Sequence, residues 1–308
     1  MLAIFLKTLP FFMLIGLGWA AARTRFFPPE AAAWLTRFVF YFALSAMLFR
    51  FAATLEISQI WDPAFAAAYL AGSLLVWGIG LAVARARKLN WSEAAMEAHC
   101  CVIGNTGFLG VPMLVALMGD AAAGPVLLVL IVDLVVFSTL ITLIITAARQ
   151  GRMSLAMIWS LLRGLIANPM IVSLLAGLIW SGAGLPLPGP VLEFLTILSA
   201  AATPGALFAI GASLAGRRAD RPATAIWLST AKLVLHPASV GIAAILLAVD
   251  PFAAGVMIAA AALPVAGNVY MLAQYFGIAV QRVSSAILIS TAASVLTIPI
   301  VMHLIEKG

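Results

Sequence analysis

Two short stretches of this sequence combine residues that could bind an anion with residues that interrupt a helix. They are GNTGFLGVP at 104–112 and LPVAGN at 263–268, and both lie inside apolar runs. Glycine and proline are poor helix formers. A break leaves backbone N–H groups without helical acceptors, and the N-terminus of a resumed helix carries partial positive charge. We therefore predict that the two stretches together hold an anion.

The predicted binding residues lie at these two breaks. In the first break, the side-chain amide of Asn105 would donate to a carboxylate, helped by neighbouring backbone N–H groups. The second break would form the opposite wall of the site. The complete predicted set is Gly104, Asn105, Thr106, Gly107, Pro264, Val265, Ala266 and Asn268.

Two charged residues, Asp133 and Lys232, lie deep in other apolar runs. A carboxylate within a membrane is costly and indicates function by default. A negative charge beside a carboxylate ligand would repel it, so Asp133 is predicted to support coupling or gating without touching the ligand. Lys232 could face the anion or neutralise Asp133. The alternative for Asp133 is a purely structural pair with Lys232.

Histidines offer little further chemistry. His236 follows Lys232 by four residues on one helical face and is expected to be a hydrogen-bonded interior residue. His99 and Glu97 lie near the start of their segment and would either line an inner vestibule or occupy a wet interface. The sequence contains no GxSxG, HExxH or P-loop motif, so we expect no enzyme activity, catalytic residue, metal or cofactor.

The elements that carry these residues must span a membrane. Of the 308 residues, 64% are hydrophobic and 9% are charged, and the mean hydropathy is +1.14. Soluble proteins carry about 25% charged residues. The net charge of +6 does not indicate a nucleic-acid partner, because the basic residues lie mostly in short loops. Cys100 and Cys101 are adjacent, so no disulfide framework is predicted.

A span of about 20 residues crosses the hydrocarbon of a bilayer. By this measure the sequence predicts an all-α polytopic protein with ten segments, at about 2–22, 31–50, 63–84, 94–118, 123–147, 157–180, 190–214, 224–248, 252–276 and 281–304.

Loop charges predict the orientation of these segments. Eleven basic residues fall in the loops after the odd-numbered segments: Arg23, Arg25, Arg85, Arg87, Lys88, Arg149, Arg152, Arg217, Arg218, Arg221 and Arg282. The other four loops contain none, although Arg50 borders one of them. The positive-inside rule therefore places the eleven in the cytoplasm and both termini outside.

The chain then divides into two halves of five segments each, 1–147 and 148–308, and the two halves cross the membrane in opposite directions. An offset of 159 residues aligns Pro10 with Pro169, Gly18 with Gly177, and Leu48-Phe49 with Leu207-Phe208. The same offset places Asn105 on Pro264, so each half breaks a helix at the same depth. Chance matching of common membrane residues is the alternative. Broken helices in two inverted halves indicate a transporter site near the bilayer midplane.

Four motifs resemble the auxin efflux carrier family of membrane transporters. They are GNTGFLGVP, LPVAGNVYMLAQ, ANPMIVSLLAGL at 167–178 and KLVLHP at 232–237. The family's crossover asparagine matches Asn105, and its second crossover proline matches Pro264. Plant members have proline just before that asparagine, where this chain has Gly104, and the long cytoplasmic loop of many plant members is absent.

The resemblance implies ten helices in a 5+5 inverted repeat, with broken, crossing helices 4 and 9. Helices 1, 2, 6 and 7 would form a static scaffold, and helices 3–5 and 8–10 would move as an elevator. It further implies a homodimer and a small organic anion, either a mono- or dicarboxylate or an auxin-like acid, carried across a bacterial-type inner membrane. Coupling to protons, to sodium or to neither stays open. The alternatives are a passive channel and a transporter-like sensor.

Overall fold

The computed structural model describes residues 2–55, 62–150, 163, 166–216 and 222–307, and these ranges are helical, with no strand among them. The first half contains α1 (Leu2–Arg23), α2 (Pro29–Phe38), η1 (Val39–Ala43), α3 (Leu44–Thr54), α5 (Pro63–Ala86), α6 (Trp91–Cys100), η2 (Thr106–Gly110), α7 (Val111–Met118), η3 (Asp120–Ala122), α8 (Ala123–Ile131), η4 (Val132–Phe137) and α9 (Ser138–Gln150).

The second half contains α11 (Pro169–Gly182), α12 (Gly189–Ala200), α13 (Ala202–Leu214), α14 (Pro222–Thr230), η5 (Ala231–Leu235), α15 (His236–Leu246), α16 (Pro251–Ala261), α17 (Gly267–Phe276) and α18 (Val280–Lys307). The elements η1, η2, η4 and η5 are single π-helical turns. Such turns interrupt helices without ending them and often occur at functional sites.

Seven helices of the described ranges are long and apolar enough to cross a membrane: Ile4–Arg23, Pro29–Thr54, Pro63–Ala86, Asp120–Ala148, Gly189–Leu214, Pro222–Leu246 and Val280–Lys307. They confirm a polytopic membrane protein. The apolar helices Thr106–Met118, Pro169–Gly182 and Pro251–Ala261 are shorter. Two of these belong to interrupted segments, and most of the predicted start of the third, at 157–165, lies outside the described residues.

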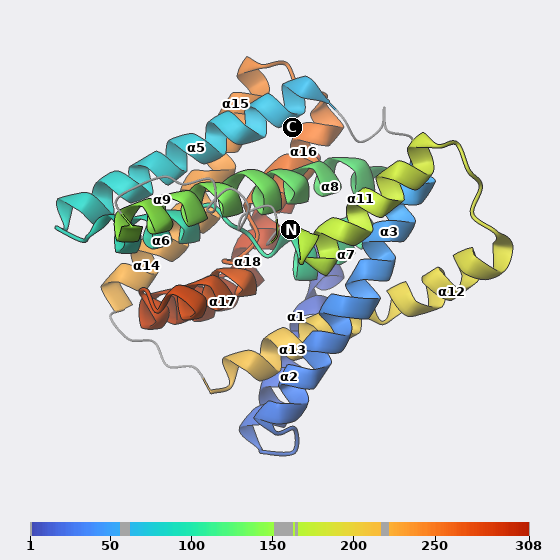
Figure 1. Cartoon of the computed structure of the whole chain (residues 1–308), viewed down its shortest axis with the longest axis horizontal. Helices are drawn as coiled ribbons and strands as arrows, with labels where there is room; N and C mark the ends of the chain where they lie inside the picture. The colour runs from blue at the N-terminus through green and yellow to red at the C-terminus, as the bar shows by residue number, and fades with distance from the viewer. Residues whose placement is uncertain (1, 56–61, 151–162, 164–165, 217–221, 308) are drawn as a thin grey trace.

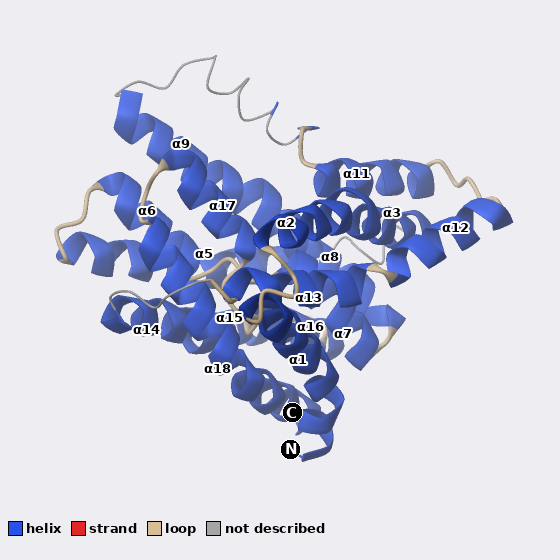
Figure 2. Ribbon diagram, turned by 90° about the horizontal axis from the view of Figure 1, so that it is seen from below, coloured by secondary structure: helices blue, strands red, loops and turns tan. Residues whose placement is uncertain are grey.

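The helices pack in two groups (Figure 1). In the first group α1 packs along α13, α3 packs along α11 and α12, and α2 contacts α13. In the second, α5 packs against α6 and α15, α14 against α18, and α8 against α16. Figure 2 shows both ends of the chain at the lower edge, where α1 and α18 are in contact. The first group contains predicted segments 1, 2, 6 and 7.

Two glycines allow close helix contacts in the first group. A Cβ on Gly18 of α1 would lie 2.1 Å from the carbonyl oxygen of Phe208, and one on Gly177 of α11 would lie 2.6 Å from that of Phe49. Small residues let membrane helices approach at backbone distance. The offset of 159 residues found in the sequence aligns Gly18 with Gly177 and Phe49 with Phe208. The contact of Gly18 with Phe208 therefore corresponds to the contact of Gly177 with Phe49.

Candidate functional site

Two interrupted helices meet at the centre of the molecule. The first is interrupted between α6 and η2, and the second between α16 and α17. Within these interruptions, Gly104 lies opposite Val265 in antiparallel orientation. The backbone N–H of Asn105 donates to the carbonyl of Pro264 at 2.9 Å, and the N–H of Ala266 donates to the carbonyl of Ile103 at 3.1 Å. These bonds satisfy groups that lipid could not satisfy.

The register of this contact differs from the offset of the sequence alignment. The sequence alignment set Asn105 on Pro264, with an offset of 159. In the structure the two hydrogen bonds correspond to each other when the offset is 161 residues. This offset pairs the donor Asn105 with the donor Ala266, and the acceptor Ile103 with the acceptor Pro264. Proline has no N–H and can only accept, so the donor position equivalent to Asn105 falls on Ala266.

Each interrupted helix resumes with a free N-terminus. The first halves, α6 and α16, begin at loops, where Asn90 and Asp250 cap them through side-chain oxygens. The second halves begin after Asn105 and Ala266, and neither residue makes a side-chain cap. The first N–H groups of a helix have no intrahelical acceptor and form its positive end. Two such ends therefore start at the crossing.

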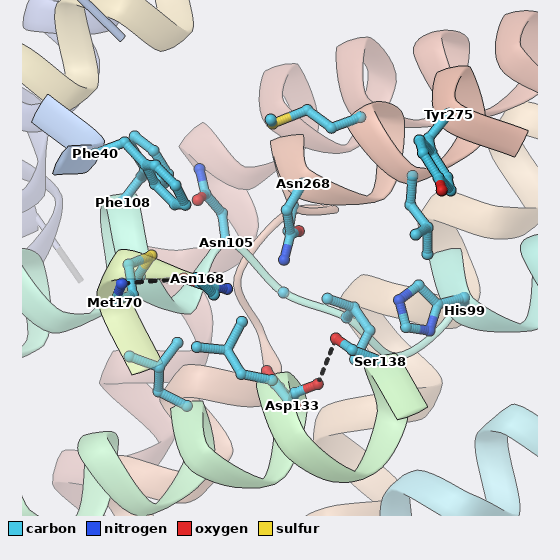
Figure 3. A pocket seen from close by; sticks show the side chains of 18 residues that line it. Phe40, His99, Asn105, Phe108, Asp133, Ser138, Asn168, Met170, Asn268 and Tyr275 are labelled. Atoms are coloured by element: carbon cyan, nitrogen blue, oxygen red, sulfur yellow. Dashed lines mark hydrogen bonds between the residues drawn. The ribbon is translucent and has the colours of Figure 1, made fainter. Parts of the chain in front are cut away.

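A cavity of about 440 Å³ lies beside the crossing (Figure 3). Its lining is largely apolar, and Phe40 and Phe108 stack in parallel on one side with ring centroids 6.1 Å apart. The polar side chains of the lining are His99, Asn105, Asp133, Ser138, Asn168, Asn268 and Tyr275. An apolar cavity with a few polar groups is typical of a small-molecule site.

Three asparagine amides reach this cavity from different elements. The side chains of Asn105 and Asn268 have no hydrogen-bond partner among the described residues. The Asn168 Oδ1 accepts from the backbone N–H of Met170 at 3.0 Å and caps α11, so its NH₂ group remains available. An amide NH₂ supplies two donors. The arrangement can therefore donate hydrogen bonds to a carboxylate without placing a cation in the cavity.

The structure brings together five of the eight residues predicted from the breaks. The cavity is lined by Gly104, Asn105, Gly107, Ala266 and Asn268. The other three lie behind the wall and have structural bonds. Pro264 accepts from Asn105, the Val265 N–H donates to Ser290 Oγ at 3.1 Å, and the Thr106 hydroxyl donates to Asp133 at 3.3 Å.

Asp133 lies in η4 and lines the same cavity, although it is only 3% exposed. Its Oδ1 accepts from the Tyr69 hydroxyl at 2.8 Å, and its Oδ2 accepts from Thr106 at the start of η2. The carboxylate therefore lies at the positive end of the resumed helix, which stabilises a negative charge. It is adjacent to the predicted ligand site, closer than the sequence analysis suggested.

Lys232 lies in η5 and is fully buried. Its Nζ donates to the carbonyl of Ala261, the last residue of α16, and lies 3.3 Å from Nδ1 of His236. The cation therefore lies at the negative end of the interrupted helix, which is the favourable end for it. Lys232 is absent from the cavity lining, so it does not face the cavity.

A direct ion pair between Asp133 and Lys232, one of the alternatives left open from the sequence, is not formed. The ion pairs of the described residues join Arg87 and Arg282 to Glu93 and Glu97. Neither buried charge has an opposite side-chain charge in contact with it within the described part of the chain. The helix interruptions supply opposite dipole ends and hydroxyl donors instead.

His236 is a hydrogen-bonded interior residue, as predicted, with its Nε2 2.9 Å from Ser73 Oγ. Glu97 is 1% exposed and paired with Arg87 and Arg282, so its predicted alternative of a wet interface is wrong. His99 is 2% exposed and lines the cavity, so it is not at a wet interface either.

Sequence reasoning missed Asn168, Ser138 and the aromatic wall. Asn168 precedes Pro169, and this pair is a typical helix start. That signal predicts a cap but not a cavity. Ser138 bonds the carbonyl of Asp133 at 3.2 Å, a contact that arises from the π-helical turn and has no sequence signal we recognise.

An all-helical membrane protein with a largely apolar cavity, carrying a few polar groups, beside two interrupted helices has the organisation of a membrane transporter. A family model described as "Membrane transport protein" matches residues 3–302. The chain belongs to this family, which includes the auxin efflux carriers, and it is a transporter and not an enzyme. It is 32% identical over 304 residues to a "Putative malonate transporter" of Rhizobium meliloti (strain 1021), covering 97% of this chain and 95% of that protein.

Proposed function

We propose that this protein is a secondary carrier that binds a small organic anion, a mono- or dicarboxylate, at the crossing of its two interrupted helices. One observation carries the proposal: three available asparagine amides and two uncapped helix starts surround one cavity of about 440 Å³. Anions bind at such helix ends. The name of the related protein, which specifies malonate, supports a carboxylate substrate.

We propose a ten-helix architecture with inverted repeats at 1–147 and 148–308. The exchanged contacts of Gly18 with Phe208 and of Gly177 with Phe49 support it, because a two-fold relation between halves requires reciprocal contacts. The exchanged hydrogen bonds of Asn105 and Ala266 support it at the crossing.

The two packing groups suggest how the site would move. The group formed by α1–α3 and α11–α13 would be the scaffold, and the remaining helices would carry the site as an elevator. Many large apolar side chains of α2 and η1 are exposed, among them Trp34, Tyr41 and Phe42. This surface would face lipid or the second scaffold of a homodimer.

Orientation completes the proposal: an inner membrane with both termini outside and the loop at Arg87 in the cytoplasm. Single cysteines introduced near Arg87, and also near Arg152 and Arg218 outside the described ranges, should react only with reagents that enter the cytoplasm. Labelling of an N-terminal cysteine from the cytoplasmic side would overturn both the orientation and the inverted repeat.

Coupling to protons or sodium would act through Asp133, whose carboxylate lies at the resumed helix next to the cavity. Protonation would weaken its interaction with that helix end. Counterflow measured with pH and sodium gradients imposed separately would show which ion, if either, drives transport.

The central experiment is counterflow in proteoliposomes loaded with unlabelled malonate. A carrier accumulates external labelled malonate transiently above its equilibrium level, because exchange continues against the labelled gradient. A passive channel would only equilibrate the label, and a transporter-like sensor would bind malonate without moving it. Either result would overturn the proposed carrier. Absence of binding across a panel of organic acids would reject the anion site itself.

A further inference from the structure

Besides the asparagines at the crossing, the cavity has a buried polar side chain, His99, with no bonding partner among the described residues. The His99 ring is 2% exposed, and neither ring nitrogen is hydrogen-bonded within the described residues, with Nδ1 wholly enclosed. His236 is equally buried, but Ser73 and Lys232 contact its two nitrogens. Buried polar groups are normally satisfied, and leaving one unbonded costs free energy. His99 therefore has hydrogen-bonding capacity that the fold does not use.

The position of His99 separates it from the asparagine end of the cavity. Figure 3 shows His99 and Tyr275 on one side of the lining residues and Asn105 and Asn168 on the other, with Asn268 between them. A ligand with one carboxylate at the asparagine end would extend its remaining atoms toward the imidazole.

Neighbouring groups do not compete for this imidazole. Glu97 precedes His99 by two residues in α6, but Arg87 and Arg282 pair with it. The two Asp133 oxygens accept from Tyr69 and Thr106. The last carbonyls of α6, at Glu97, Ala98 and His99, accept from the N–H groups of residues 101–103. None of these groups bonds the imidazole, so a ligand oxygen that enters the cavity can do so.

We infer that His99 binds the second carboxyl group of a dicarboxylate, and that this hydrogen bond makes the cavity select dicarboxylates over monocarboxylates. The inference rests on the proposed carboxylate site at the crossing. An imidazole N–H donates to a carboxylate oxygen, and charge-assisted bonds of this kind are stronger than neutral ones. A monocarboxylate of equal size would bind at the asparagine end and offer His99 only an uncharged acceptor, which makes a weaker hydrogen bond.

The test compares two ligands with the same carbon skeleton, malonate and its monomethyl ester, by titration calorimetry on purified protein. We expect the wild type to bind malonate about tenfold or more tightly, as for loss of one bond to a charged group. His99→Leu should weaken malonate binding much more than ester binding and bring the two affinities close together. His99→Asn, which retains a donor, should restore part of the preference.

Cys100→Ala is the matched control, because Cys100 is the buried neighbour of His99 and does not line the cavity. It should keep the malonate preference. Equal weakening of both ligands in a stable His99→Leu protein, or no change in either, would overturn the role of His99 while leaving the asparagine site intact. Failure of the wild type to bind either ligand would instead reject the proposed function. The affinities of oxalate, malonate, succinate and glutarate should also be measured for the wild type and for His99→Leu. They should depend on chain length in the wild type but not in the variant.

Discussion

Asp133 and Lys232 lie beside the same crossing, and each stabilises the end of a different interrupted helix. Asp133 accepts from Thr106 at the start of η2, and Lys232 donates to the carbonyl of Ala261 at the end of α16. Each charge has the sign that its helix end favours. Tyr69 and Ser73, one turn apart on α5, connect to Asp133 and to His236 respectively. The two charges therefore help to hold the interrupted helices in place without a direct ion pair.

Removing the Lys232 cation should destabilise the protein. Lys232→Met preserves most of the side-chain volume but removes the charged donor to the buried Ala261 carbonyl, and losing such a hydrogen bond costs about 1–3 kcal/mol. The substitution also removes the buried positive charge beside the crossing. Lys232→Ala should destabilise the protein more than Lys232→Met, because it removes the same charge and also leaves a cavity. Thermal unfolding in detergent measures both. The exposed Lys307→Met provides the control, and equal melting temperatures for Lys232→Met and that control would contradict the capping role.

Asp133→Asn should separate binding from transport. The amide oxygen can still accept from Tyr69, so stability and malonate affinity should stay near wild type. Loss of the negative charge at the start of η2 should slow counterflow by about tenfold, corresponding to about 1.4 kcal/mol, and should change its pH dependence. Both assays must use the same purified protein. Lost binding at wild-type stability would make Asp133 a direct ligand, and normal binding with normal counterflow would leave it purely structural.

Asn105→Ala should weaken malonate binding by about 1–3 kcal/mol, because the ligand carboxylate would lose a donor. The backbone bond from residue 105 to Pro264 does not need the side chain, so the fold should persist. Calorimetry measures the affinity, and thermal unfolding checks the fold. Unchanged affinity in a folded Asn105→Ala protein would refute the assignment. Asn268→Ala should also weaken malonate binding.

Gly18→Ala should disturb the contact of α1 with α13. The new Cβ would lie 2.1 Å from the Phe208 carbonyl oxygen, closer than any real contact allows, so the helices must separate. Overpacking of this kind costs about 1–3 kcal/mol. Gly177→Ala should have a comparable effect against Phe49, as the proposed two-fold relation requires.

Gly16 provides the control for this pair of substitutions, because a Cβ there would meet nothing within 4 Å. Gly16→Ala should leave the melting temperature unchanged or slightly raised, since alanine is the better helix former. A Gly18→Ala protein as stable as Gly16→Ala would show that the close helix contact does not exist.

The sequence determined the features that depend on local composition. Long apolar runs specify helices that cross a membrane, because a helix satisfies its backbone hydrogen bonds within the segment, as lipid requires. Glycine and proline at 104–112 and 263–268 specify helix interruptions regardless of how the apolar segments pack together. The charges at positions 133 and 232 were recognisable because the sequence around them is apolar.

Only the tertiary structure decided how these features meet. The two-residue difference at the crossing follows from antiparallel hydrogen bonding between Asn105 and Pro264 and between Ala266 and Ile103, which no alignment encodes. The partners of Asp133 and Lys232 come from helix ends brought together in space. The same is true of His99 and Asn168, which are distant in sequence and line one cavity. Local patterns specify where a helix is interrupted, whereas long-range packing selects the groups that satisfy the interruption.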